Sequence, residues 1–180
     1  DPDDVIAQIE RYRRETGCKH VHAAFGAGMP AHDTEYSTLG DFEAQAELIR
    51  RGDLSAVEAV EAALTRIDAV NPQLNAVITP LYDGARAAAV AHDRARPAGG
   101  GVAGGEPAAP FAGVPFLIKD LMVHTTGDRY CAGMPVLKAI DYRPAYDTEL
   151  AVRFRQAGLV VMGKTNTPEW GSLPTTEPLA

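Results

Sequence analysis

A strand–helix–strand pattern in the second half of the chain limits the possible folds most. Residues 114–119 form an apolar run, residues 147–156 have helical spacing, and "LVVMGKTN" follows as a second apolar run. Asp147 is the expected N-cap of a helix that continues through Gln156, and the inner face of this helix consists of Leu150, Phe154 and Ala157. A crossover helix between two buried strands makes those strands parallel and places them close together in one sheet.

Both apolar runs lack polar alternation, as expected for strands in a sheet that is covered on each side. Two strands are too few to complete an α/β domain from a chain of 180 residues. We therefore predict an α/β fold, in which this chain contributes part of a large mixed sheet covered by helices.

The pattern before residue 75 predicts a helical hairpin. Asp41 begins the first helix, which Gly52 ends. Ser55 and Glu58 have the spacing of a capping box, so the second helix is expected to begin at Ser55. Its apolar positions repeat at helical spacing, and the Asn-Pro pair at 71–72 is expected to end it.

The remaining segments are expected to be one helix, a charged arm and loops. An alanine-rich helix is predicted from Leu81 to about Arg96, followed by a glycine-rich surface loop over 96–110. Residues 120–146 are rich in glycine and proline and are predicted to be loops. Residues 1–40 are expected to be an N-terminal arm with a short charged helix over 2–16, outside a single domain over 41–180.

Charge and composition exclude several classes of partner. The chain has 17 basic and 24 acidic residues, a net charge of −7, so nucleic acid is not expected as a partner. No apolar run approaches the roughly 20 residues that span a bilayer. The start, "DPDDVIAQIE", has no signal-peptide pattern, and Cys18 and Cys131 form no disulfide framework. A cytoplasmic location is therefore expected.

Lys119 is the first candidate for chemistry, because it ends an apolar strand. A lysine surrounded by apolar groups loses proton affinity and can act as a general base near neutral pH. The alternative is structural: Lys119 either pairs with Asp120 or extends its ammonium into water. Neighbouring residues on a strand point to opposite faces, which makes Asp120 a poor partner.

Two other motifs are weaker. "GLVVMGKT" (158–165) matches the P-loop pattern, but a helix precedes it and its four central residues are typical of a strand rather than a loop. "CKHVH" (18–22) has ligand types that zinc accepts, but no second pair stands at suitable spacing. We therefore expect neither a nucleotide nor a metal, and no cofactor.

A nucleophile is missing from the sequence. Of three serines, Ser55 is a helix cap, Ser37 lies in the arm and Ser172 lies in the proline-rich tail. No G-x-S-x-G turn is present, and Cys131 has only His124 nearby as a possible base. The chain thus offers a base without a nucleophile.

Three stretches resemble the amidase signature family over residues 41–180: "VNPQLNAVI" (70–78), "FAGVPFLIKDLM" (111–122) and "DTELAVRFRQAGLVVMGKTNTPEWG" (147–171). The resemblance implies a large mixed sheet between helices and hydrolysis of an amide by a Ser–cis-Ser–Lys triad. Lys119 matches the catalytic lysine. Both serines of the family follow the point at which this chain stops, so the resemblance covers an N-terminal part. "TTEPLA" and "NPQLNAVITPLY" are most similar to amidases near the 6-aminohexanoate cyclic dimer hydrolases.

The resemblance also suggests a substrate wall and partners. "GDRYCAGMP" (127–135) corresponds to a region that borders the substrate, which makes Cys131, Ala132 and Met134 candidate binding residues. The expected partners are a small-molecule amide and the C-terminal remainder of the enzyme; a homodimer stays open. The alternatives are a non-catalytic binding or scaffold chain of the same fold, and a P-loop nucleotide binder.

We expect residues 1–180 alone to hydrolyse no amide, because no serine is placed to attack. The isolated piece should also aggregate, because unpaired apolar strand edges would be exposed. Amide hydrolysis and molecular mass, measured with and without the serine-bearing segment, test this. A soluble, monomeric and active 180-residue protein would contradict the triad and return attention to Cys131 or Ser172.

Overall fold

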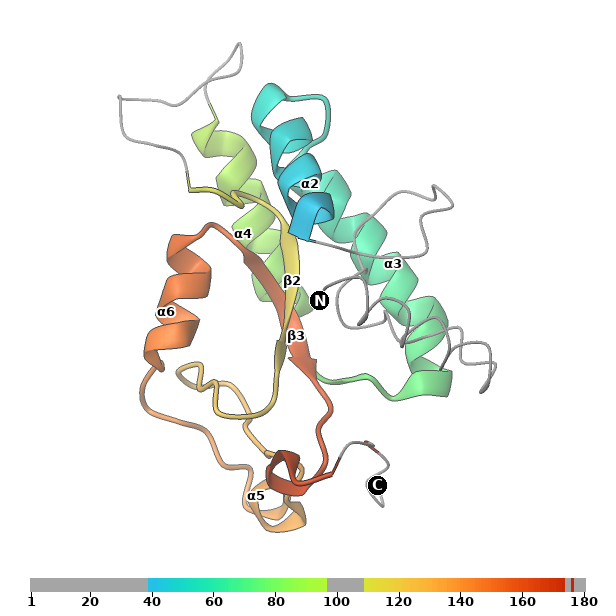
Figure 1. Cartoon of the computed structure of the whole chain (residues 1–180), viewed down its shortest axis with the longest axis vertical. Helices are drawn as coiled ribbons and strands as arrows, with labels where there is room; N and C mark the ends of the chain where they lie inside the picture. Colours follow the sequence, from blue (N-terminus) through green and yellow to red (C-terminus); the bar gives the residue numbers. More distant parts are fainter. Residues whose placement is uncertain (1–38, 97–108, 174–175, 177–180) are drawn as a thin grey trace, which may run out of the picture.

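The computed structural model describes residues 39–96, 109–173 and 176. The predicted helix over 2–16, the motif at 18–22 and nearly all of the loop over 96–110 lie outside these residues. Figure 1 shows long helices beside a small central sheet, with a shorter helix on the other side of the strands. No helix in this described part is both long enough and apolar enough to cross a membrane.

The predicted helical hairpin is confirmed. Helix α2 (Leu39–Arg51) begins two residues before the predicted position and ends at Gly52, and α3 (Ala56–Leu74) follows. The capping box is present, because the Ser55 hydroxyl accepts from the Glu58 N–H at 3.1 Å. In return, the Glu58 carboxylate accepts from the Ser55 N–H at 2.9 Å.

The prediction that the Asn-Pro pair ends α3 is wrong. The helix includes Pro72 and continues to Leu74, and Asn75 (φ 47°) ends it. The Asn71 side chain holds the last turn: Oδ1 accepts from the Val77 N–H at 2.8 Å and Nδ2 donates to the Val77 carbonyl at 3.0 Å. These bonds to the next strand offset the one helical hydrogen bond that a proline removes.

The sheet is mixed and has the order β1-β3-β2 in the described residues. Strands β2 (Pro115–Lys119) and β3 (Val160–Thr165) are parallel neighbours, as the crossover pattern predicts. Strand β1 (Val77–Pro80) pairs antiparallel with β3. The sequence pattern does not predict β1, because four residues ending in proline are too short to show a strand period.

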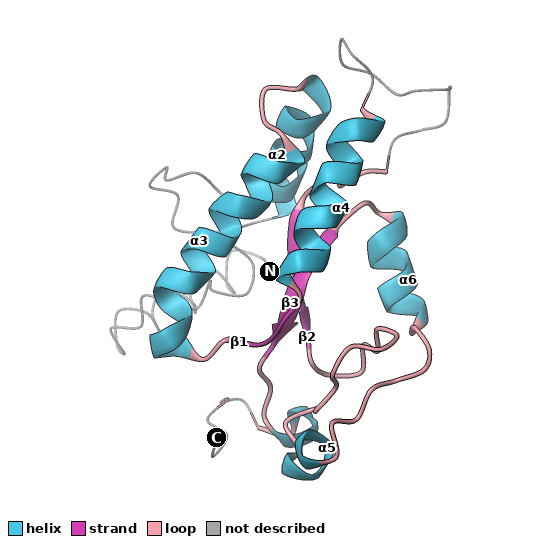
Figure 2. Ribbon diagram, turned by 180° about the vertical axis from the view of Figure 1, so that it is seen from behind, coloured by secondary structure: helices cyan, strands magenta, loops and turns pink. Residues whose placement is uncertain are grey.

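Helices cover both faces of the β2–β3 pair. Helices α3 and α4 (Tyr82–Ala95) pack on one face, where Leu64, Leu117 and Met162 are buried together. Figure 2 shows α4 in front of the strands and α3 beside it. On the other face, α6 (Glu149–Gln156) packs Ala151 and Phe154 against the strands. The α/β class and the covered sheet are thus confirmed.

Two details of α6 differ from the sequence prediction. Thr148, not Asp147, is the N-cap residue, because the Asp147 carboxylate accepts from the Thr126 N–H at 2.7 Å and contacts Arg155. Leu150 is exposed, and Ala151 is buried in its place. Phe154 does face inward, with its ring centroid 4.9 Å from that of Phe116.

Asp93 on α4 supports the start of α3. Its carboxylate accepts from the Ala56 N–H at 2.8 Å and from the Val57 N–H at 3.1 Å. These are two of the N–H groups that a helix leaves without an internal partner, and a negative charge is favourable at that end. One carboxylate therefore joins the C-terminal end of α4 to the hairpin.

We expect Asp93→Asn to lower the free energy of unfolding by about 1 kcal/mol, because it removes a charged cap. Asp68→Asn is the matched control: Asp68 is exposed on α3 and caps no helix, so a change within about 0.5 kcal/mol is expected. Urea unfolding of the intact protein measures both. Equal effects of the two variants would contradict the capping role.

Candidate active site

Lys119 stands at the carboxyl end of β2, where the sequence predicts it, but its side chain is exposed. The expectation that apolar neighbours bury this ammonium is wrong for the described residues. In the sheet register, Lys119 pairs with Thr165, and Ile118 pairs with Lys164. Because side chains alternate along a strand, the two lysines lie on opposite faces.

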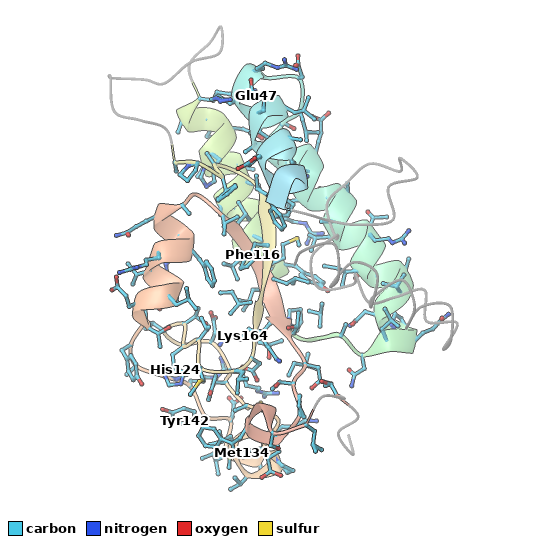
Figure 3. All side chains as sticks on the ribbon, in the orientation of Figure 1. Glu47, Phe116, His124, Met134, Tyr142 and Lys164 are labelled. Carbon is cyan, nitrogen blue, oxygen red and sulfur yellow. The ribbon has the colours of Figure 1, made fainter. Side chains whose placement is uncertain are left out.

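Lys164 is the buried lysine of the sheet and is fully shielded from solvent. Its Nζ donates to the Arg129 carbonyl at 3.0 Å and lies 5.8 Å from the centroid of the Tyr130 ring. Burial lowers the pKa of Lys164, while the negative charge of Asp120 opposes that shift. Figure 3 shows Lys164 at the end of the sheet nearer His124 and Tyr142, away from Phe116.

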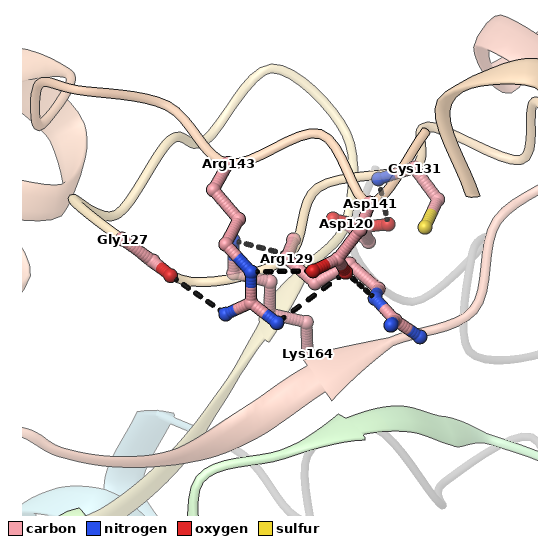
Figure 4. Close-up of polar contacts among 7 residues, drawn as sticks. All are labelled: Asp120, Gly127, Arg129, Cys131, Asp141, Arg143 and Lys164. Atoms are coloured by element: carbon pink, nitrogen blue, oxygen red, sulfur yellow. Dashed lines mark hydrogen bonds and ion pairs between the residues drawn. The ribbon is translucent and has the colours of Figure 1, made fainter. Parts of the chain in front are cut away.

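Asp120 follows β2 and is also fully buried. Its Oδ2 accepts from two successive peptide N–H groups, that of Cys131 at 2.8 Å (Figure 4) and that of Ala132 at 3.2 Å. Its Oδ1 is buried and has no hydrogen-bond partner among the described residues. Burial raises the pKa of Asp120, opposed by these backbone bonds and by the charge of Lys164.

The predicted wall residues are thereby brought to the end of β2. Cys131 and Ala132 are buried, and Met134 is half-buried directly before the short helix α5 (Pro135–Ala139). The Ala132 carbonyl accepts from the Trp170 N–H at 2.9 Å, which ties the segment to the 3-10 turn η2 (Glu169–Gly171) after β3. The wall thus contacts residues that follow both parallel strands.

Cys131 is poorly suited to act as a nucleophile. Burial raises the pKa of its thiol, and the nearby Asp120 carboxylate raises it further. The thiolate is the reactive form, so both effects reduce reactivity. His124 packs edge-on against Tyr130 and Tyr146, and within the described residues it makes no hydrogen bond to Cys131.

The P-loop alternative is contradicted by the backbone. Residues 160–165 form β3, α6 precedes them, and no helix begins after Thr165 before η2. The backbone N–H groups of a strand pair within the sheet and cannot surround a phosphate. In the ranges that the structure describes, no three His, Cys, Asp or Glu residues gather as a metal site would require.

Sequence reasoning missed Asp120 and Lys164 as parts of the site. Asp120 is considered there only as a poor partner for Lys119, and Lys164 only within the P-loop pattern. The available signal was a charged residue within or directly after an apolar strand, a position that requires a buried partner. Nothing in the sequence indicated that the partner would be the backbone of residues 129–132.

The fold and the site together define a class. It is an α/β protein in which the parallel strands β2 and β3 end beside a loop. Buried side chains bind the backbone of this loop, and of the two lysines in these strands Lys119 is exposed and Lys164 is buried. The family model called Amidase matches residues 58–180. The chain therefore belongs to the amidase family, as the sequence resemblance predicts.

Individual relatives support the assignment to the amidase family. The 6-aminohexanoate-cyclic-dimer hydrolase of Paenarthrobacter ureafaciens is 44% identical over 140 residues, covering 78% of this chain and 25% of that protein. The hydrolase of the same name from a Pseudomonas species (strain NK87) is 43% identical over 140 residues, with the same coverage of 78% and 25%. A glutamyl-tRNA(Gln) amidotransferase chain of Salinispora tropica is 41% identical over 132 residues, covering 73% and 25%. The chain thus spans about a quarter of the length of the relatives that it matches.

Solved structures show the same fold. The structure of a 6-aminohexanoate cyclic dimer hydrolase has a TM-score of 0.65 and 42% identity, covering 77% of this chain and 26% of that one. The peptide amidase from Stenotrophomonas maltophilia has a TM-score of 0.60 and 32% identity, covering 72% and 25%. These neighbours are amidase signature enzymes.

Gly133 lies where the candidate wall packs against the backbone of Pro168. It has φ +70°, and a Cβ there would lie 2.6 Å from the Pro168 backbone. Gly127 has a similar φ of +79° but open space around it. We expect Gly127→Ala to cost about 1 kcal/mol, the effect of the backbone conformation alone.

Gly133→Ala should lower the free energy of unfolding by at least about 2 kcal/mol more than Gly127→Ala, because backbone must move to admit the methyl group. Chemical unfolding of both variants gives the comparison. Similar losses for the two would show that the contact between the wall and Pro168 is loose.

Proposed function

We propose that this chain forms part of an enzyme that hydrolyses a carboxylic amide, with Lys119 as the base of a Ser–cis-Ser–Lys triad. The observation that carries the proposal is the position of Lys119 at the carboxyl end of β2, directly before Asp120, whose carboxylate binds the Cys131–Ala132 backbone. Family membership supports the reaction class. Lys119 therefore lies next to the residue that holds the proposed substrate wall.

In this proposal, an exposed lysine becomes a base only when the serines cover it. The matched relatives are far longer than the matched segment, and we place both serines in the part that this chain does not match. The nucleophilic serine would attack the amide carbonyl. Its proton would pass through the second serine to Lys119. No cofactor takes part.

The proposed substrate is a small carboxylic amide. One side of the acyl pocket would consist of Cys131, Ala132 and Met134. Asp120 binds the backbone N–H groups of the first two of these residues. The cyclic dimer of 6-aminohexanoate is the first substrate to test, because relatives with 44% and 43% identity carry that name. L-Glutamine is the second, because a glutamyl-tRNA(Gln) amidotransferase chain is also related.

The scaffold alternative predicts a different result. A non-catalytic chain of the same fold would bind a partner without using Lys119, and no amide would be consumed. Hydrolysis of any amide in the panel, lost when Lys119 is replaced, separates the two functions. The domain boundary at residues 40/41 and a homodimer remain proposals.

We expect Lys119→Ala in the intact enzyme to lower amide turnover by at least about 10³-fold, since a triad that loses its base loses coupled proton transfer. Folding should be unchanged, because the side chain is exposed. Lys138→Ala is the matched control, since Lys138 lies on the short helix α5, outside the proposed triad. Near-normal turnover by a folded Lys119→Ala enzyme would end the proposal.

A further inference from the structure

The two fully buried charged side chains of the described residues lie at the same end of the sheet. Asp120 follows β2, and Lys164 lies in β3, the strand that pairs with it. Within this described part of the chain, the carboxylate and the ammonium form no direct ion pair, and their hydrogen bonds go elsewhere. Two buried charges that do not touch must each be stabilised by something else.

The segment 129–132 supplies those groups. Lys164 donates to the Arg129 carbonyl, and Asp120 accepts from the N–H groups of Cys131 and Ala132. The cation therefore binds the negative end of one peptide group, and the anion binds the positive ends of two others. Figure 4 shows both side chains directed toward this segment.

We infer that Asp120 and Lys164 are positioning residues, which hold the backbone of residues 129–132 between them and so fix one wall of the substrate pocket relative to Lys119. The inference rests on the proposed function for its effect on substrate. It assigns the lysine of the P-loop-like motif a role inside the protein, and it gives Asp120 a role distinct from ion pairing with Lys119.

The geometry explains why a charge is used at each position. A bond from N–H to carboxylate is about twice as strong as one between neutral groups, and one Oδ2 atom accepts two of them. Two neutral contacts also hold the segment, from the Met122 N–H to the Tyr130 hydroxyl at 3.2 Å and from the Trp170 N–H to the Ala132 carbonyl. The charged side chains add bonds at Arg129, Cys131 and Ala132.

The test needs a readout on the segment itself, and Cys131 provides one. Its side chain is only 7% exposed, so alkylation by iodoacetamide requires local opening. Peptide mass spectrometry reports labelling of Cys131 separately from any other cysteine. In the intact protein we expect Asp120→Asn, which keeps the shape and removes the charge, to raise the labelling rate at least about tenfold.

Asp93→Asn is the control for general destabilisation, because it weakens the cap of α3 without touching the segment. The labelling rates of Cys131 are compared under conditions in which both variants have the same free energy of unfolding. If Cys131 is labelled no faster in Asp120→Asn than in Asp93→Asn, the inference is overturned. Lys164→Met should also raise the rate. In the double variant Asp120→Asn/Lys164→Met, the increase in labelling rate should be smaller than the product of the two single increases, because no unpaired buried charge is left. An increase equal to that product would show that the two residues act independently, which would contradict the inference.

The effect on substrate is measured as a ratio. The kcat/KM for the cyclic dimer of 6-aminohexanoate, divided by that for a short linear amide, does not depend on how much protein is folded. We expect Asp120→Asn to change this ratio at least about threefold and Asp93→Asn to leave it unchanged. An unchanged ratio in Asp120→Asn would overturn the link to the pocket.

Failure of the proposed function gives a different pattern. If the wild-type enzyme hydrolyses neither amide, then the reaction assigned to Lys119 is wrong, and the labelling experiment still decides whether Asp120 and Lys164 hold the segment. If amides are hydrolysed and labelling is unaffected, the function stands and the inference falls.

Discussion

The architecture of the site depends on the burial of two opposite charges at one end of the β2–β3 pair. Removing a carboxylate or an ammonium from water costs several kcal/mol even after the protein relaxes. Asp120 and Lys164 are both fully buried, yet their main hydrogen bonds go to the backbone of residues 129–132. The loop therefore has to occupy one position, because any other would leave a charge inside the protein without a partner.

This constraint separates the roles of two lysines that look alike in sequence. Each ends or nearly ends an apolar strand, and the register of β2 and β3 places them on opposite faces. Lys164 is enclosed, its Nζ already bound to a carbonyl, so it has no access to a substrate. Lys119 is exposed and can meet groups from elsewhere in an enzyme of this family. Burial marks the positioning residue here, and exposure marks the proposed base.

Sequence reasoning reached the elements that local signals define and missed those that distant contacts define. The capping box at Ser55 and the parallel pair β2–β3 were predictable, because spacing alone specifies them. Strand β1 was not predictable, because it has only four residues and exists through its pairing with the distant strand β3. Asn71 likewise extends α3 past Pro72 through bonds to Val77, which no local rule contains. The candidate wall was named by resemblance, but its attachment to Asp120 depends on a contact between residues 11 and 12 positions apart, which no local pattern specifies.

The way in which the wall is held also bears on specificity. Asp120 binds peptide N–H groups, so it places no demand on the side chains of residues 131 and 132. Those positions are restricted by burial and by the backbone: Ala132 has φ +49°, and Gly133 lies against Pro168. A β-branched residue at 132 would be strained, and the buried side chain at 131 is limited by its packing, whereas the side chain at 134 is only half-buried. In the proposed pocket, Met134 is therefore the position at which a side chain can change most freely while Asp120 and Lys164 hold the backbone of residues 129–132.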